Sequence, residues 1–155
     1  MDCVSGQNNR RLILSTTKIN RINGACEDIS SKNPALLAYI EGDFKIIYDD
    51  KVFLEDNYMC VLELAVQLTV WLKCKGDFSY DAISSEDKDI LLFSSINESE
   101  FVVSSAWSES KAFTISKEEL FISVMCYIFN IDRLLKKLFN IEVCDFLPAG
   151  FWDDN

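Results

Sequence analysis

The sequence predicts an α+β fold, in which a mostly antiparallel sheet is packed by two main helices. Segments rich in β-branched and aromatic residues alternate with two long stretches of helical periodicity, in the order strands, helix, strands, helix. The chain of 155 residues has the length of one domain. No internal repeat, linker or low-complexity tract divides it. We therefore expect a single α+β domain over residues 1–155.

The N-terminal part of the chain supplies the first strands. Residues 1–34 are polar, and we expect an irregular region apart from a short strand at Leu12–Leu14. From Leu36 to Tyr48 the chain is rich in β-branched and aromatic residues, and this pattern resumes at Lys51–Asp56. The acidic pair Asp49-Asp50 separates the two runs, so the segment predicts a β-hairpin.

A helix and three short strands are predicted next. In Met59–Lys73 apolar residues recur at spacings of three and four, which indicates a helix with one buried face, and Gly76 is its expected stop. The segments Phe78–Ile83, Asp89–Ile96 and Glu100–Trp107 have strand composition and are expected to form a meander.

The second long helix begins at Ser116. Glu119 follows three residues later, which is the pattern of a capping box, and three basic residues gather near the far end of the helix. The first half of this helix is apolar on nearly all sides. We therefore expect other elements to cover it on more than one side.

The C-terminal tail, residues 145–155, combines large aromatic residues with carboxylates. Phe151 and Trp152 precede Asp153 and Asp154, while Pro148 and Gly150 oppose helix continuation. Two interpretations stay open. The aromatic residues can fold back as a lid over the second helix, or they can form an exposed anchor ringed by carboxylates, as at binding hot spots.

The charge balance favours binding over catalysis. The chain holds 25 acidic and 15 basic residues, for a net charge of −10, and it has no histidine. Histidine is the usual proton-transfer group near neutral pH and the commonest metal ligand. A strongly negative chain attracts basic surfaces and repels nucleic acid and anionic membranes. We therefore expect a protein that is not an enzyme and binds neither nucleic acid nor membrane.

Carboxylates gather in local groups along the chain. Each group is explained by solvated turns, because aspartate is a common turn residue, but their shared sign also predicts a negative surface for a basic partner. The predicted partner-binding residues are Asp49, Asp50, Glu55 and Asp56 around the hairpin, Asp81 and Asp87 before a later strand, and Phe151, Trp152, Asp153 and Asp154 in the tail.

We predict no catalytic residue, no cofactor and no metal ligand. The acidic groups lack the spaced pattern of a calcium-binding loop. The serine-rich segments have neither a histidine nor an SxxK lysine to activate a nucleophile. The glycines are isolated, so no phosphate-binding loop is expected.

The cysteines and the apolar runs indicate a cytoplasmic protein. Six cysteines lie far apart with no CxxC motif, and four of them lie in or beside apolar segments, which favours buried reduced thiols. The longest apolar run, Leu120–Ile131, is much shorter than a membrane span. The first residues lack the layout of a signal peptide.

The middle third of the chain resembles a class of bacterial immunity proteins. The similarity lies in residues 38–80, where YIEGDFKIIYDDKVFLED runs into VLELAVQLTVWL and then GDFSYD. Its apolar spacing and turn acids resemble immunity proteins of contact-dependent growth inhibition and related polymorphic toxin systems. As a class these proteins are small, cytoplasmic, often acidic and variable in sequence, so the resemblance assigns no role to any single residue.

This resemblance implies a function by binding. An immunity protein neutralises a cognate toxin domain, often a basic nuclease, by covering its active or substrate-binding surface. Two other functions remain open from the residues alone. One is a ligand-binding or regulatory α+β module with a pocket between helix and sheet, and the other is a carboxylate-dependent hydrolase.

Overall fold

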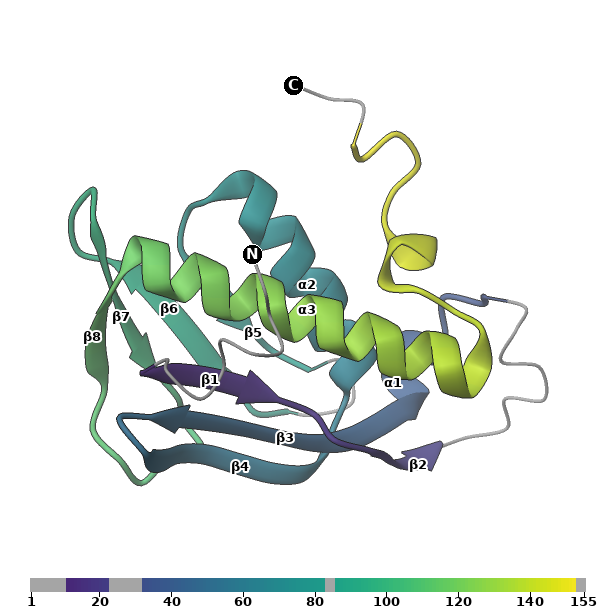
Figure 1. The fold of residues 1–155 in the computed structure, drawn as a ribbon, viewed down its shortest axis with the longest axis horizontal. Helices are drawn as coiled ribbons and strands as arrows, with labels where there is room; N and C mark the ends of the chain where they lie inside the picture. The colour runs from purple at the N-terminus through teal and green to yellow at the C-terminus, as the bar shows by residue number, and fades with distance from the viewer. Residues whose placement is uncertain (1–10, 23–31, 83–85, 153–155) are drawn as a thin grey trace.

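A computed structural model describes residues 11–22, 32–82 and 86–152. Within these ranges, strands form two antiparallel sheets of four strands each, and helices pack against them (Figure 1). The predicted α+β class is therefore confirmed. The sequence pattern predicts one sheet, however, and the strands divide between two.

The first sheet is built around the long strand β3 (Ile40–Tyr48). Two short strands, β1 (Leu12–Ser15) and β2 (Ile19–Ile22), pair with successive parts of β3. β4 (Lys51–Met59) pairs with β3 as the predicted hairpin, with Asp49 and Asp50 in the turn. The sheet therefore depends on β3, which is the only strand that pairs with each of the other three in the described residues.

The N-terminal region is more ordered than its composition predicts. β1 confirms the expected strand at Leu12–Leu14, but β2 lies within the segment predicted to be irregular. The pairing with β3 at Ile19 and Ile22 stabilises β2, and a short strand of this kind leaves little periodic signal in its own sequence.

The predicted strand from Leu36 starts four residues later than expected. Leu36–Tyr39 form the short helix α1, and β3 begins at Ile40. Asn33 explains the difference, because its side-chain oxygen accepts a hydrogen bond from the backbone N–H of Ala35 at 2.9 Å. Its carbonyl also accepts one from the N–H of Leu36 at 2.9 Å. This turn chemistry favours a helical first turn over an extended chain.

The second sheet is the predicted meander with one more strand. β5 (Phe78–Tyr80), β6 (Leu91–Ser95), β7 (Glu100–Ser104) and β8 (Phe113–Ser116) lie in that order, each antiparallel to the next. The sequence pattern does not predict β8, which runs directly into the last helix.

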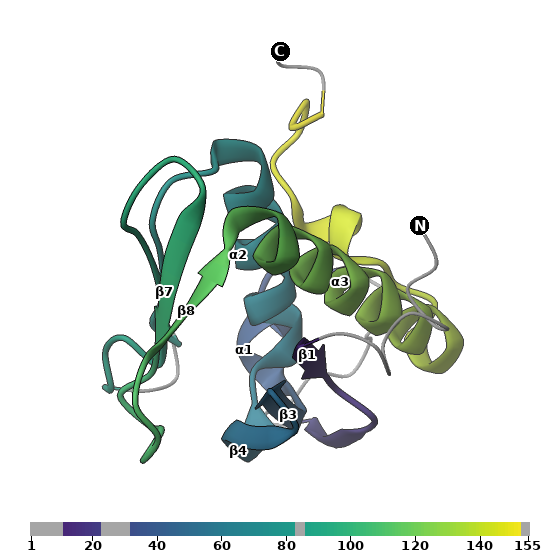
Figure 2. The same ribbon diagram turned by 60° about the vertical axis from the view of Figure 1, so that its left-hand side comes forward.

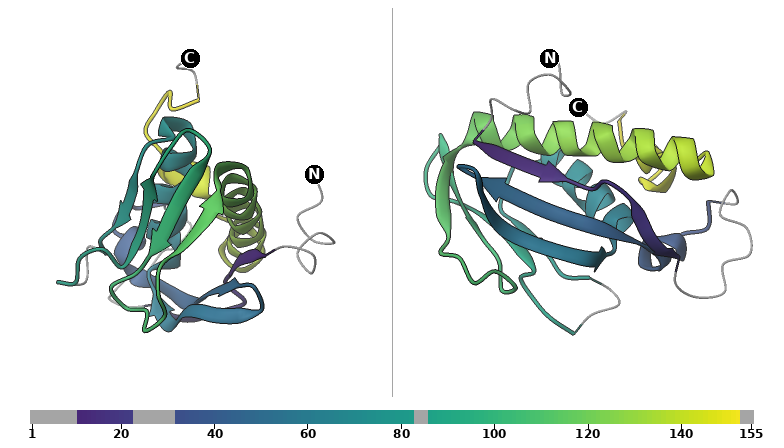
Figure 3. Two further views of the ribbon diagram at one scale, coloured as in Figure 1. Left: turned by 90° about the vertical axis from the view of Figure 1, so that its left-hand side faces the viewer. Right: turned by 60° about the horizontal axis from the view of Figure 1, so that its bottom comes forward.

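Two long helices fill the corner between the sheets (Figures 2 and 3). α2 (Val61–Cys74) contacts β3 of the first sheet and β5 of the second, and it also packs against α3 (Lys117–Phe139). α3 contacts β1, β7 and β8. Both helices therefore have one side that faces the sheets.

The helix ends follow the predicted capping chemistry closely. The Ser116 hydroxyl accepts a hydrogen bond from the backbone N–H of Glu119 at 3.1 Å, which caps α3 as predicted. The stop of α2 falls one residue before Gly76. Lys75 adopts the left-handed conformation with φ of 61°, and its N–H bonds to the carbonyl of Trp71.

Trp71 is the centre of the core between α2 and the second sheet. Only 3% of it is exposed. Its ring lies 4.9–6.1 Å, centroid to centroid, from Phe78, Phe93, Phe101 and Phe121. Its indole N–H donates to the carbonyl of Gly76 at 2.6 Å, so the polar atom is also satisfied.

Candidate functional site

The predicted acids of the hairpin turn lie at the corner of the first sheet. Asp49 and Asp50 have φ values of 49° and 65°, as the tight turn between β3 and β4 requires. Asp49 accepts two hydrogen bonds from the guanidinium of Arg11, at 3.0 and 3.3 Å. Hydrogen bonding to Arg11 lowers the pKa of Asp49, so this carboxylate is held in its charged form.

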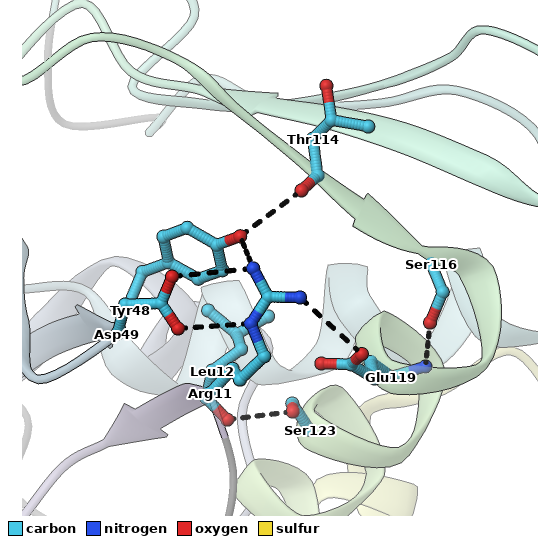
Figure 4. A network of polar contacts seen from close by, with 8 residues as sticks. All are labelled: Arg11, Leu12, Tyr48, Asp49, Thr114, Ser116, Glu119 and Ser123. Atoms are coloured by element: carbon cyan, nitrogen blue, oxygen red, sulfur yellow. Dashed lines mark hydrogen bonds and ion pairs between the residues drawn. The ribbon is translucent and has the colours of Figure 1, made fainter.

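Arg11 extends this contact into a network that joins four elements (Figure 4). Its guanidinium also donates to the hydroxyl of Tyr48, and this hydroxyl donates to the carbonyl of Thr114 in β8 at 3.3 Å. On its other side the guanidinium lies 4.0 Å from the carboxylate of Glu119 in α3. Asp49 therefore has a structural partner, and its charge is partly compensated within the chain.

The acids farther along β4 have local partners too. Glu55 lies 3.1 Å from the ammonium of Lys45, its neighbour across the hairpin. Asp56 accepts a hydrogen bond from the backbone N–H of Tyr58 at 3.0 Å. Glu55 is exposed, so a basic partner can still reach it in competition with Lys45.

Asp81 and Asp87 shape the connection between β5 and β6. Asp81 accepts from the backbone N–H of Asp89 at 2.7 Å. Asp87 accepts from the indole N–H of Trp107 at 2.8 Å. Both fit the expectation that aspartates act as turn formers, although Asp87 is exposed and its charge contributes to the surface potential.

The described part of the tail lies on another side of the molecule. Figures 1 and 2 show the yellow segment that follows the short helix η3 (Val143–Phe146) running toward the top, whereas the β3–β4 hairpin lies at the bottom. Lys73 of α2 holds the tail, because its ammonium lies 4.4 Å from the ring centre of Phe151 and also donates to the carbonyl of Phe151. Asp153 and Asp154 lie outside the described residues.

The predicted residues therefore do not form one binding face. Four of the acids belong to the β3–β4 hairpin, but the described part of the tail lies on the far side of the molecule from this hairpin. The lid interpretation of the tail is also incomplete, since 65% of Trp152 is exposed. A spacing pattern indicates charge density along the chain, but it carries no information about which turns meet in space.

A groove that the sequence pattern does not predict lies beside the tail. It has a volume of about 430 Å³ and is bounded by α2, α3, the short helix η3 (Val143–Phe146) and the residues that follow it. The lining is mostly apolar and includes Leu72, Met125, Ile128, Phe129, Leu147 and Trp152. We call this feature the apolar groove.

The helix α3 is expected to be covered on more than one side, and it contacts α2, β1, β7 and β8, but the apolar groove leaves part of its apolar surface open. Met125 is 44% exposed and Phe129 is 51% exposed. The sequence gives one sign of this open surface. The first half of the helix has more apolar residues than one packed face requires. A wider apolar surface than the core can cover is typical of a binding site.

Asp132 places a half-buried carboxylate in the wall of the apolar groove. One of its oxygens accepts a hydrogen bond from the backbone N–H of Val143 at 2.7 Å, which joins α3 to η3. Burial raises the pKa of Asp132, the hydrogen bond from Val143 opposes this rise, and nearby Glu142 and Asp145 add to it. The carboxylate is therefore in a site that disfavours its own charge.

Three potential metal ligands lie next to this wall. Ligand atoms of Glu142, Cys144 and Asp145 lie within 4.8 Å of one another. Asp145 accepts from the N–H of Glu142 at 2.9 Å and lies 3.4 Å from the ammonium of Lys32. Burial and the neighbouring carboxylates raise the pKa of the Cys144 thiol, which disfavours the thiolate that a metal needs. In this structure, Glu142 and Asp145 cap the first turn of η3.

The cysteines depart from the predicted set of buried reduced thiols. Cys60 is buried and not disulfide-bonded, whereas Cys74 and Cys144 are free and exposed. Cys126 is disulfide-bonded, so the expectation of reduced thiols is wrong at this position. In the part of the chain that the structure describes, no helix is both long and apolar enough to cross a bilayer.

Comparison with known proteins places the chain in a family. The profile of a family described as a domain of unknown function, DUF7878, matches residues 16–137. The chain belongs to the DUF7878 family. The DUF7878 match runs from just before β2 into the last turns of α3, so it leaves out Arg11, η3 and the tail. No curated protein and no solved structure matches the chain significantly.

Proposed function

We propose that this protein is an immunity protein, which binds a cognate toxin domain and blocks its active or substrate-binding surface. The observation that carries the proposal is the net charge of −10 on a chain without histidine. Charge of this sign speeds association with a basic surface and opposes binding to nucleic acid. A basic nuclease is therefore the partner class that this protein is best suited to inhibit.

The environment of the acids supports binding rather than catalysis. Asp49, Asp81 and Asp87 each accept hydrogen bonds that fix a turn or join two elements. None of these contacts pairs two carboxylates in the way that glycoside hydrolysis requires. The exposed acids Asp50, in the turn, and Glu55, on β4, both belong to the β3–β4 hairpin, where they can steer a basic partner.

The proposed compartment is the cytoplasm, where a delivered nuclease acts. The free thiols of Cys74 and Cys144 support this proposal, whereas the disulfide at Cys126 counts against a uniformly reducing environment. Counting alkylated thiols by mass spectrometry, in protein trapped with the reagent inside cells, tests the assignment. A disulfide present in nearly all molecules contradicts it.

The proposal is tested first with the product of the adjacent gene. We expect the two proteins to co-purify, and we expect expression of this chain to restore growth of cells that produce the toxin domain. A neighbouring toxin that binds but keeps its full activity contradicts the proposal. Partner-free protein should show neither DNA nor RNA binding at physiological salt, and binding by gel shift also contradicts it.

A charge reversal then tests the hairpin. The double change Asp50→Lys and Glu55→Lys should slow association about tenfold and reduce its salt dependence, because long-range attraction acts mainly on the association rate. Glu98→Lys with Glu109→Lys is the matched control, since it reverses two exposed charges in loops of the second sheet. An equal fall in the association rate in both double variants would assign the effect to net charge alone, and the hairpin would then have no steering role.

The groove favours a second candidate function, a ligand-binding module. The sequence leads us to expect the pocket of such a module between a helix and the sheet. The apolar groove has the size of a ligand pocket, but it lies between α2, α3 and η3 instead. Failure of the toxin experiments together with ligand binding in the groove would favour this function. The groove can also serve a ligand in an immunity protein, so the two functions are not exclusive.

A further inference from the structure

We propose that the apolar groove binds a small apolar organic cation, whose aromatic or aliphatic body lies against α3 and whose ammonium group pairs with Asp132. The proposal goes beyond the immunity function and does not depend on it. It rests on the shape of the groove, its lining and the placement of a single carboxylate within it.

The size and lining of the groove match an organic ligand. Its volume of about 430 Å³ falls within the range of about 300–1,000 Å³ that is typical of small-molecule sites. Walls come from α2, α3 and η3, and Leu147 and Trp152 of the tail add a further side. Binding of an apolar body would remove Met125 and Phe129 from water, and both are now about half exposed.

Asp132 provides the specificity for positive charge. Among the described residues, it is the only charged one in the lining of the groove. Its Oδ1 accepts from Val143, and this bond fixes the orientation of the carboxylate. Among the residues that the structure describes, no donor reaches Oδ2. A ligand ammonium can therefore use this oxygen without displacing an existing hydrogen bond.

The surrounding charges also favour a cation. Asp132 is close enough to Glu142 and Asp145 for their charges to interact unfavourably. Two nearby bases are paired with those two acids: Lys136 lies 3.8 Å from Glu142, and Lys32 lies 3.4 Å from Asp145. No ion pair within 4.0 Å compensates Asp132 itself in the described residues. An ammonium at Asp132 would supply that compensation.

Aromatic side chains add a second attraction for the same group. Phe129 and Trp152 both line the groove, and the faces of aromatic rings attract organic cations. The guanidinium of Arg133 already lies 5.9 Å from the ring centre of Phe129, so this ring accepts a cation on one face. A neutral ligand of the same shape would gain the apolar contacts but neither of these charge interactions.

The test compares a charged and a neutral probe of the same shape. The probes are 3-phenylpropylamine and 3-phenylpropanol, titrated into ¹⁵N-labelled full-length protein at pH 7. We expect the amine to bind about tenfold more tightly than the alcohol, with shifts concentrated at the amides of residues 125–132 and 143–147. Equal affinities, shifts elsewhere, or no binding of the amine at millimolar concentration overturn the proposal.

Two variants separate the role of Asp132 from net charge. Asp132→Asn keeps an acceptor for the N–H of Val143 and removes the charge, so the preference for the amine should fall below about twofold while the alcohol binds as before. Glu118→Gln removes the same charge from the exposed first turn of α3 and should change neither affinity. An amine preference that survives in Asp132→Asn overturns the proposal.

A peptide probe tests the other possible occupant. An acetylated, amidated Leu-Lys-Phe tripeptide carries the same chemistry on a backbone, as a partner protein would. Binding of this peptide more tightly than the amine would make the groove a protein-docking surface and overturn the assignment to a small molecule. Toxin binding is measured separately, so loss of the amine site leaves the proposed immunity function untouched.

Discussion

The two long helices each have a closed side and an open side. On its closed side α2 places Trp71 among four phenylalanine rings, and only 3% of this residue is exposed. On its open side α2 contributes Leu72 to the apolar groove, opposite a tail whose Trp152 is 65% exposed. The two tryptophans, one in α2 and one in the tail that lies across the groove from it, therefore have opposite environments.

This contrast shows what determines whether an aromatic residue stabilises the fold or remains available to a ligand. Trp71 faces a sheet whose strands are fixed by pairing, so its ring is enclosed and its indole N–H is bonded. Trp152 follows Pro148 and Gly150 in a segment without strand pairing. The number of fixed neighbours, rather than residue type, separates a core position from a binding position.

The largest expected effect is on the closed side of α2. Trp71→Ala removes a buried ring and leaves a cavity among four phenylalanines, so the free energy of unfolding should fall by about 3–5 kcal/mol. Trp71→Phe should lower the free energy of unfolding by less than Trp71→Ala does, because an aromatic ring remains in the core. Urea denaturation followed by circular dichroism measures both variants. A loss below about 1 kcal/mol in Trp71→Ala would remove the distinction between the two sides.

A smaller effect is expected on the closed side of α3. The hydroxyl of Ser123 is buried and donates to the carbonyl of Leu12 in β1 at 2.8 Å, as Figure 4 shows. Ser123→Ala leaves that carbonyl without this donor and should cost about 1 kcal/mol. Ser110→Ala, an exposed loop position, is the control and should change stability by less than about 0.5 kcal/mol. Equal losses of stability in Ser123→Ala and Ser110→Ala would argue against a specific stabilising contact between β1 and α3.

Trp152→Ala tests the open side. Because most of this side chain is exposed, the free energy of unfolding should change by less than about 0.5 kcal/mol, in contrast with Trp71→Ala. The same denaturation experiment applies. A loss of 2 kcal/mol or more, on the order of a core substitution, would instead support the interpretation of the tail as a lid over α3.

A further small effect is pH-dependent and concerns Asp132. Because burial raises the pKa of Asp132 in the folded state, the stability linked to this group is complete below the ordinary value of 3.8 and is lost as the pH rises through the raised value. Asp132→Asn should therefore be the more stable protein at pH 7, by less than about 1 kcal/mol, since solvent screens a half-buried carboxylate.

Thermal unfolding at pH 3.5, 5 and 7 measures this difference. We expect the advantage of Asp132→Asn over the parent protein to grow as the pH rises. Glu118→Gln serves as the control, because its carboxylate is exposed in the first turn of the same helix. An advantage that is constant across the three pH values would show that the charge of Asp132 carries no cost in the folded protein.

The parts of the fold that can be predicted are those whose signals come from residues close together in the sequence. Helical periodicity identifies α2 and α3, and Ser116 with Glu119 locates the start of α3, because these signals come from residues close in sequence. The strands β2 and β8 are only four residues long and depend on pairing with β3 and β7. Their own residues therefore give too little pattern to predict them.

The candidate sites show the same limit more strongly. The acids of the hairpin are visible as a charged run, but the pairing of Asp49 with Arg11 joins residues 38 positions apart. Likewise, the excess of apolar residues on α3 is visible, but periodicity cannot show that Met125 and Phe129 lack a covering element. The apolar groove exists because η3 turns back to place Val143 against Asp132, which is a tertiary contact.

The three tryptophans also give the molecule three distinct optical environments. Trp71 is enclosed, Trp107 is partly covered, and Trp152 is open to solvent, so emission from the last should lie at the longest wavelength. A diffusing quencher will reach Trp152 first. Because the chain carries a net charge of −10, caesium ions should quench this indole more efficiently than iodide ions do. Filling of the groove can thus be followed as the loss of caesium quenching at a single indole.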